Sequence, residues 1–139
     1  MILGFNPACL EILRRMNISK PKFYLTGSRY FGYAQHDSDW DFFTGQDNST
    51  LNHLEILGFN RLSMHPDWFD ENCISIYHHP VDIHVAIVKD VELKKRTQAY
   101  IRDTAPRYLE MLKRDKSNSI RVWNEVYRIL NGDKNVTKL

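Results

Sequence analysis

The chain has little cysteine and no long apolar run. Its two cysteines, Cys9 and Cys73, are too few for a disulfide scaffold and lack the paired spacing of a zinc site. No segment approaches the run of about 20 apolar residues that a membrane-spanning helix needs, and residues 1–11 do not resemble a secretory signal. We therefore expect a cytoplasmic protein with reduced, partly buried thiols and no membrane partner.

Internal repeats, low-complexity tracts and linkers rich in Pro, Gly or Ser are also absent from the sequence. A length of 139 residues suits one domain with one hydrophobic core. The hydrophobic fraction of 42% and the charged fraction of 26% are those of an ordinary globular protein, which excludes a disordered or fibrous chain. We expect residues 1–139 to form a single domain.

Charge is distributed unevenly although the formal net charge is only +2. Residues 1–88 carry 6 Lys and Arg against 10 Asp and Glu, a net charge of −4, whereas residues 89–139 carry 13 against 7, a net charge of +6. Two interpretations stay open. The basic half either attracts phosphate groups toward an acidic, metal-binding front half, or it only solvates the surfaces of helices.

Residue patterns predict an α/β (α+β) fold, a small mixed sheet with helices packed on it. The expected elements are a helix from Pro7 to about Met16 capped by Asn6, strands over 23–25 and 40–44, a helix capped by Asn48 or Ser49 and stopped by Gly58, strands over 59–62, 73–77 and 81–88, and helices opening near Asp90, Pro106 and Ser117. The last three helices form a helical C-terminal tail over about 90–131.

Two aspartates, Asp39 and Asp41, mark the expected site of chemistry. Residues two apart on a strand point to the same face, so these carboxylates lie side by side. They repel each other unless a cation lies between them. Hard cations such as Mg²⁺ prefer oxygen ligands. Asp82, within the later strand predicted over 81–88, can face the same cleft as a third carboxylate.

The segment Gly27-Ser28-Arg29 follows the first predicted strand and supplies a complementary feature. A glycine at that point permits close approach of the backbone, and free N–H groups at a helix start bind phosphate oxygens. The Ser28 hydroxyl adds a donor, and Arg29 adds charge and a planar fork. The sequence therefore predicts a phosphate-binding turn next to a metal-binding carboxylate pair.

The spacing Gly27-Ser28, ten residues, Asp39-x-Asp41 resembles the motif of the DNA polymerase β-like nucleotidyltransferase superfamily, in particular its minimal members. The resemblance covers about residues 22–88, the expected catalytic core, and leaves the tail unassigned. It implies a nucleotidyltransferase fold. It also implies Mg²⁺ or Mn²⁺ held by Asp39, Asp41 and Asp82, with Asp82 assisting deprotonation of the acceptor and Gly27 and Ser28 holding phosphates.

By the same resemblance, the expected reaction moves a nucleoside monophosphate from a nucleoside triphosphate, with ATP the expected donor, to a hydroxyl acceptor. The chain has no room for large domains that position tRNA or template DNA. The acceptor is therefore expected on a protein, a small RNA or a small molecule, and minimal members often modify a toxin protein. A homodimer or a partner protein can close the cleft, with Trp123 either in the core or at an interface.

Other interpretations remain. The chain can be a non-catalytic member of the same fold that binds a nucleotide or a partner, or a nucleic-acid-binding module that uses the basic helices of the tail. His79, Asp82 and His84 resemble a two-histidine, one-carboxylate metal set, although His84 can instead contact an acceptor or phosphate. No Walker-type loop follows Gly27, and Ser28 lacks the glycine spacing of a hydrolase nucleophile.

Overall fold

The protein is described by a computed structural model over residues 7–18, 22–62 and 70–132. A five-stranded mixed sheet forms its centre, with the strand order β1-β2-β5-β4-β3. β2 and β5 run parallel, and the other neighbouring pairs run antiparallel. The strands are β1 Tyr24–Thr26, β2 Trp40–Gly45, β3 Asn60–Arg61, β4 Cys73–His79 and β5 Ile83–Val88. A small mixed sheet with packed helices confirms the predicted fold class.

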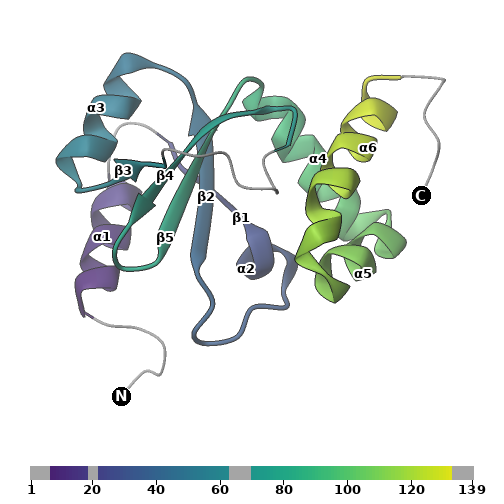
Figure 1. Ribbon diagram of the computed structural model, residues 1–139, viewed down its shortest axis with the longest axis horizontal. Helices are drawn as coiled ribbons and strands as arrows, with labels where there is room; N and C mark the ends of the chain where they lie inside the picture. The colour runs from purple at the N-terminus through teal and green to yellow at the C-terminus, as the bar shows by residue number, and fades with distance from the viewer. Residues whose placement is uncertain (1–6, 19–21, 63–69, 133–139) are drawn as a thin grey trace.

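One face of the sheet is covered by α1 (Pro7–Ile18) and α3 (Asn48–Ile56), as Figure 1 shows. β5 alternates as predicted, and its Ile83, Val85 and Ile87 are fully buried against these helices. Apolar side chains of α1 and α3 complete this first hydrophobic cluster, so the removal of apolar surface from water holds the two helices against the sheet.

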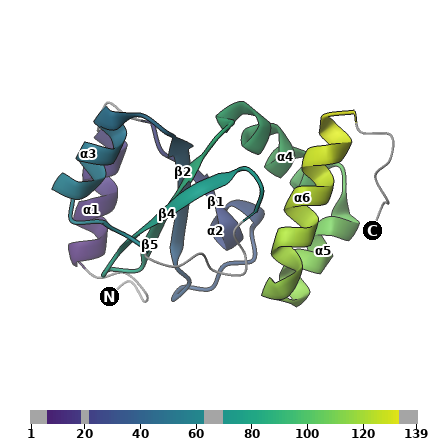
Figure 2. The same ribbon diagram turned by 45° about the horizontal axis from the view of Figure 1, so that its top comes forward.

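The C-terminal helices pack together at the other end of the molecule, around a second hydrophobic cluster (Figures 1 and 2). They are α4 Val91–Asp103, α5 Pro106–Arg114, the short 3₁₀ turn η1 Lys116–Asn118 and α6 Ser119–Leu130, and the short α2 Gly27–Phe31 joins them. Trp123 and Tyr127 are buried there, which places Trp123 in the core of this chain. Length alone had suggested a single core.

Local sequence rules explain most element boundaries, but the cap of α3 differs from its prediction. The N-cap of α3 is Asp47, whose side chain accepts hydrogen bonds from the backbone and hydroxyl of Thr50; the prediction had chosen Asn48 or Ser49. The first helix begins at Pro7 as expected, and its predicted cap Asn6 lies outside the described residues. Within the described ranges, no helix combines the length and the apolar character needed to cross a membrane.

The hairpin between β4 and β5 differs from its prediction in a way that matters for the site. His79 pairs with Ile83, so the turn occupies residues 80–82 and β5 begins two residues later than expected. Asp82 ends this turn with φ +64°, and it is the one non-glycine residue with positive φ among those described. Aspartate tolerates this left-handed conformation better than most residues. Asp82 is therefore a turn residue rather than a strand residue.

Candidate active site

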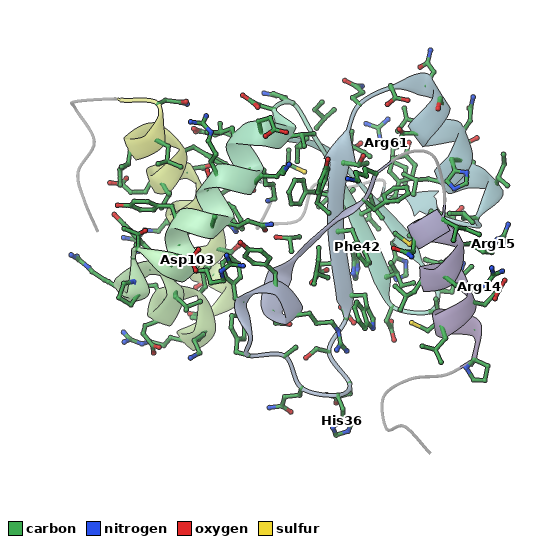
Figure 3. The ribbon with its side chains drawn as sticks, turned by 180° about the vertical axis from the view of Figure 1, so that it is seen from behind. Arg14, Arg15, His36, Phe42, Arg61 and Asp103 are labelled. Atoms are coloured by element: carbon green, nitrogen blue, oxygen red, sulfur yellow. The ribbon has the colours of Figure 1, made fainter. Side chains whose placement is uncertain are left out.

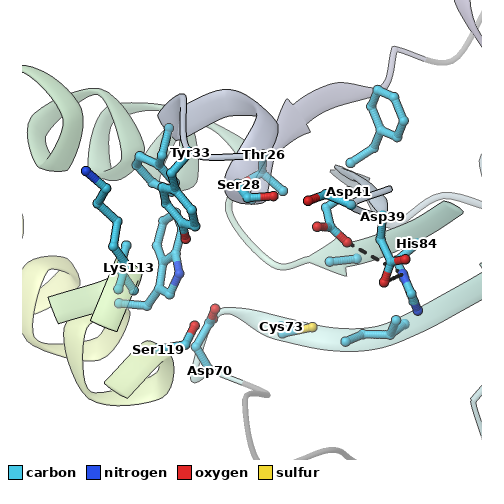
Figure 4. A pocket seen from close by; sticks show the side chains of 18 of the residues that line it. Thr26, Ser28, Tyr33, Asp39, Asp41, Asp70, Cys73, His84, Lys113 and Ser119 are labelled. Carbon is cyan, nitrogen blue, oxygen red and sulfur yellow. Dashed lines mark ion pairs between the residues drawn. The ribbon is translucent and has the colours of Figure 1, made fainter. Parts of the chain in front are cut away.

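A cleft of about 990 Å³ separates the sheet from the C-terminal helices. Its floor is formed by the end of β1, the start of α2 and the central strands β2 and β5, and its far wall is formed by α4, α5 and α6 (Figure 4). Predicted site residues Gly27, Ser28, Asp39 and Asp41 all line this cleft. Residues far apart in the sequence thus meet in one place.

Asp41 is the second residue of β2 and Asp39 immediately precedes that strand, and both residues line the cleft. Their side chains are 46% and 35% exposed, so both are open to solvent. His84, the β5 partner of Asp41, points its Nδ1 atom at both carboxylates, 3.7 Å from Asp39 Oδ2 and 3.6 Å from Asp41 Oδ1 (Figure 4). A basic ring nitrogen between two carboxylates offsets part of their mutual repulsion when it is protonated.

Gly27 lets the first turn of α2 approach Asp41 closely. The glycine has φ +71°, and a Cβ atom on it would lie 2.5 Å from Asp41 Oδ2 and 3.0 Å from Asp41 Cβ, so the Asp41 side chain would have to move. The next residue, Ser28, lines the cleft and continues α2. The predicted approach of the glycine turn to the carboxylate pair therefore has a direct steric basis.

Two uncharged polar side chains line the same cleft. The Thr26 side chain is buried and lines the cleft, its residue pairs with Asp41 across β1 and β2, and its Oγ1 has no hydrogen-bond partner among the described residues. Burial, and then the charge of Asp41, raise the pKa of the Tyr33 phenol. Tyr33 therefore keeps its proton at neutral pH and can donate a hydrogen bond into the cleft.

The wall opposite the carboxylates is basic at its end. Lys113 and Arg114, the last residues of α5, line the cleft, and Lys113 also pairs with Glu110 at 3.4 Å. A helix C-terminus carries a partial negative charge that cations complement, which favours basic residues here for structural reasons as well. Asp115 lines the same end of the cleft, so the wall is of mixed charge there, and both interpretations of the charge distribution stay open.

A buried ion pair closes the deep end of the cleft. Lys94 Nζ lies 3.6 Å from Asp70 Oδ2, with both side chains about nine-tenths buried or more, and stacks 3.8 Å above the ring of Trp123. The Tyr127 hydroxyl donates to Asp70 Oδ1 at 3.2 Å. Asp70 is therefore already committed to internal partners, and sequence reasoning had given neither it nor Lys94 a role.

Asp82 does not line the cleft. Its side chain is exposed, and its backbone carbonyl accepts a hydrogen bond from Trp40 N at 3.0 Å. The charge of Asp82 acts instead on Cys9 in α1. Burial raises the pKa of that thiol, the charge of Arg29 lowers it, and the charge of Asp82 raises it. The left-handed turn thus leaves Asp82 away from the carboxylate pair, and the expectation that it faces the cleft is corrected.

Arg29 is also placed differently from the prediction. Its guanidinium donates hydrogen bonds to the carbonyls of Ser38 at 2.6 Å and Asp39 at 3.3 Å, and it lies over the ring of Trp40 at 4.2 Å. It does not line the cleft. Arg29 holds the loop before β2, whose exposed tip carries His36 (Figure 3). Its hydrogen bonds therefore position Asp39, whereas the prediction had given Arg29 a phosphate to bind.

The donor chemistry of the cleft fits a hard divalent cation in part. Asp39 and Asp41 offer carboxylate oxygens next to the turn at Gly27, and phosphate oxygens and water can supply the remaining ligands, as is usual for Mg²⁺. Among the described residues, no three side chains of His, Cys, Asp or Glu are already arranged to hold a metal ion. His79, Asp82 and His84 do not assemble into a set either: His84 lies with the carboxylate pair, and Nδ1 of His79 accepts from Val81 N.

Comparisons of the chain with protein-family models, with curated proteins and with solved structures find no match. The resemblance to nucleotidyltransferases therefore depends on the glycine–serine turn, the aspartate pair and the geometry that joins them.

Proposed function

We propose that this chain is a metal-dependent nucleotidyltransferase that moves a nucleoside monophosphate from a nucleoside triphosphate to a hydroxyl acceptor. The observation that carries the proposal is the close approach of Gly27 to Asp41. The backbone turn at Gly27 is suited to phosphate, and it leaves no room for a Cβ atom beside the carboxylate of Asp41. ATP is the proposed donor, and the acceptor is a hydroxyl of a protein, a small RNA or a small molecule.

In this proposal Asp39 and Asp41 hold Mg²⁺ or Mn²⁺ at the floor of the cleft. When bound, the ion neutralises the triphosphate and stabilises the departing pyrophosphate. The turn at Gly27 and the hydroxyl of Ser28 position the phosphate chain, and the proton kept on Tyr33 offers a further donor. Lys113 and Arg114 attract the triphosphate electrostatically from the opposite wall.

The test is transfer of radioactive label. The full chain is incubated with Mg²⁺ or Mn²⁺, each of four α-³²P-labelled nucleoside triphosphates and lysate of the host cell as a source of acceptor. We expect label on one class of acceptor with the wild-type chain and none with Asp39→Asn/Asp41→Asn. Label that persists in the double variant contradicts the proposal, and so does the absence of label from the wild-type reaction with all four donors.

One observation favours a second candidate, a nucleotide-binding protein without catalysis. The carboxylate expected to assist the acceptor, Asp82, does not line the cleft. A chain of this kind binds a triphosphate in a metal-dependent manner and transfers nothing. Equilibrium binding of a fluorescent triphosphate, measured beside the labelling assay, separates the two candidates.

A further inference from the structure

A histidine occupies the strand position next to Asp41 where a third carboxylate was expected. β2 and β5 run parallel with Asp41 opposite His84, and both side chains point into the cleft (Figure 4). Asp82, two residues earlier, lies in the left-handed turn and outside the cleft. The side chains that surround the point between β2 and β5 are therefore two carboxylates and one imidazole.

The distances from His84 to the two carboxylates are close to those between ligands of one cation. Ligand atoms that hold an ion at about 2.1 Å lie about 3.0–3.5 Å from one another in octahedral or tetrahedral arrangements. His84 Nδ1 lies 3.6 Å and 3.7 Å from the nearest oxygens of Asp41 and Asp39. The imidazole is thus slightly farther from each carboxylate than ligands of one ion are from one another, and a bound cation must draw it toward them by a few tenths of an ångström.

Neighbouring side chains hold His84 in this orientation and leave one polar group unused. His84 is 22% exposed, and the ring of His78 on β4 lies 4.9 Å from its ring. On the other side of Asp41, the buried hydroxyl of Thr26 lines the cleft with no hydrogen-bond partner among the described residues. The Thr26 hydroxyl is therefore available to a ligand or to water in the cleft. Elsewhere in the described chain, buried polar atoms of His53, Gln98 and Glu125 also lack a hydrogen-bond partner.

We propose that Asp39, Asp41 and His84 form one mixed oxygen–nitrogen site that binds a transition-metal ion such as Mn²⁺ in preference to Mg²⁺. Imidazole suits transition metals, whereas Mg²⁺ selects oxygen ligands. The proposal deepens the proposed function by naming the cation, and it uses the same cleft. The opposing explanation is that a protonated His84 takes the place of a cation and repels metal.

The two explanations predict opposite effects of removing the imidazole. Mn²⁺ binding to the full chain without nucleotide is measured by electron paramagnetic resonance, and Mg²⁺ binding is measured by competition. If His84 is a ligand, His84→Gln weakens Mn²⁺ binding by about 10- to 100-fold and changes Mg²⁺ binding by less than about threefold. If His84 acts as a competing cation, His84→Gln tightens the binding of both ions.

Pulsed measurements of the same samples give a readout that folding defects do not imitate. We expect a ¹⁴N coupling to bound Mn²⁺ in the wild-type chain, its loss in His84→Gln, and its retention in the control Asp82→Asn. His84→Asp, which restores a third carboxylate, should shift the preference toward Mg²⁺ by about tenfold or more. Absence of the nitrogen coupling from the wild-type chain overturns the proposed site.

Failure of this site is distinguishable from failure of the proposed function. Tighter Mn²⁺ binding in His84→Gln, or no Mn²⁺ binding to the wild-type chain at millimolar concentration, overturns the mixed site. Label transfer that still requires Asp39 and Asp41 then leaves the function standing. Conversely, the nitrogen coupling without any label transfer supports the site and contradicts the enzyme.

Discussion

At the scale of single residues, two glycines between β1 and β2 share a backbone conformation but differ in their surroundings. Gly27 and Gly32 have φ +71° and +87°, so alanine at either position is strained by about 1–3 kcal/mol. A Cβ atom at Gly27 meets Asp41, whereas nothing lies within 4 Å of one at Gly32. We expect Gly27→Ala to lower label transfer by about 100-fold, since misplacement of a reacting group by about 1 Å has that effect.

Gly32→Ala is the matched control for this prediction. Chemical unfolding should show a similar loss of stability in both variants, and label transfer should fall by less than about threefold in Gly32→Ala once folded protein is counted. Equal activity losses in the two variants would show that backbone strain, and not contact with Asp41, makes Gly27 necessary.

Also at the residue scale, the predicted start of the strand over 81–88 was wrong. The alternation of Val81, Ile83, Val85 and Ile87 correctly indicated a buried strand face, but it extended the strand two residues too far. The hairpin needs residues 80–82 for its turn, and the positive φ of Asp82 depends on the pairing of His79 with Ile83. That register is a property of two strands together, so one strand's pattern does not reveal it.

At the scale of elements, Arg29 connects α2 to the loop that precedes β2. Its hydrogen bonds to the carbonyls of Ser38 and Asp39 use the planar fork of the guanidinium, which lysine lacks. We expect Arg29→Lys to lower kcat by about 10- to 100-fold because Asp39 is less well positioned, while KM for the triphosphate changes by less than about threefold. Steady-state kinetics over a range of triphosphate concentrations measure both constants.

An effect on KM instead of kcat would support the prediction from the sequence, in which Arg29 binds a phosphate. If Arg29 contacts a phosphate, Arg29→Lys raises KM and leaves kcat nearly unchanged, because lysine keeps the charge. Arginine beside a glycine–serine turn suggested phosphate binding from residue type alone. The actual hydrogen bonds are to a loop seven to ten residues away, whose path the sequence does not specify.

At the scale of the whole molecule, the cleft brings Asp39 and Asp41 of the acidic half of the chain together with cations of the basic half. Lys113 and Arg114 line the cleft, whereas Arg107 and Arg121 are exposed and do not line it. We expect Lys113→Gln/Arg114→Gln to raise KM for the triphosphate by about 10-fold at low salt, less at high salt. Arg107→Gln/Arg121→Gln removes the same charge and should change KM by less than about twofold.

If the two double variants raise KM for the triphosphate equally, then the net charge of the chain attracts the substrate, and the position of Lys113 and Arg114 in the cleft does not matter. The sequence indicated the charge asymmetry but not which cations meet Asp39 and Asp41. That meeting depends on how α4, α5 and α6 pack around Trp123 and the sheet, which is a matter of tertiary contacts. The motif residues and fold class were therefore predictable, and the second wall of the cleft was not.

Stability at alkaline pH is a second property of the whole fold. Burial raises the pKa of the Cys73 thiol from 9.0 to about 12. Between these values the unfolded chain has lost this proton and the folded chain has kept it, so the free energy of unfolding falls as pH rises. We expect urea titrations to show a loss of about 2 kcal/mol from Cys73 between pH 9 and about 10.5.

Cys73→Val tests that assignment, since it removes the thiol and keeps an apolar side chain. The variant should lose less stability over the same pH interval than the wild-type chain. Tyr127, whose pKa burial also raises, contributes in the same direction and leaves a residual slope. An unchanged slope in Cys73→Val would show that this thiol is not the group responsible.

The fate of the donor phosphates tests the central claim most directly. Two parallel reactions contain wild-type chain, divalent cation and acceptor, one with α-³²P-labelled and one with γ-³²P-labelled triphosphate. The account predicts that the α-label moves to the acceptor while the γ-label leaves as pyrophosphate, both only with Asp39 and Asp41 intact. A γ-label on the acceptor would indicate phosphoryl transfer, and label on the acceptor in neither reaction would contradict catalysis by this cleft.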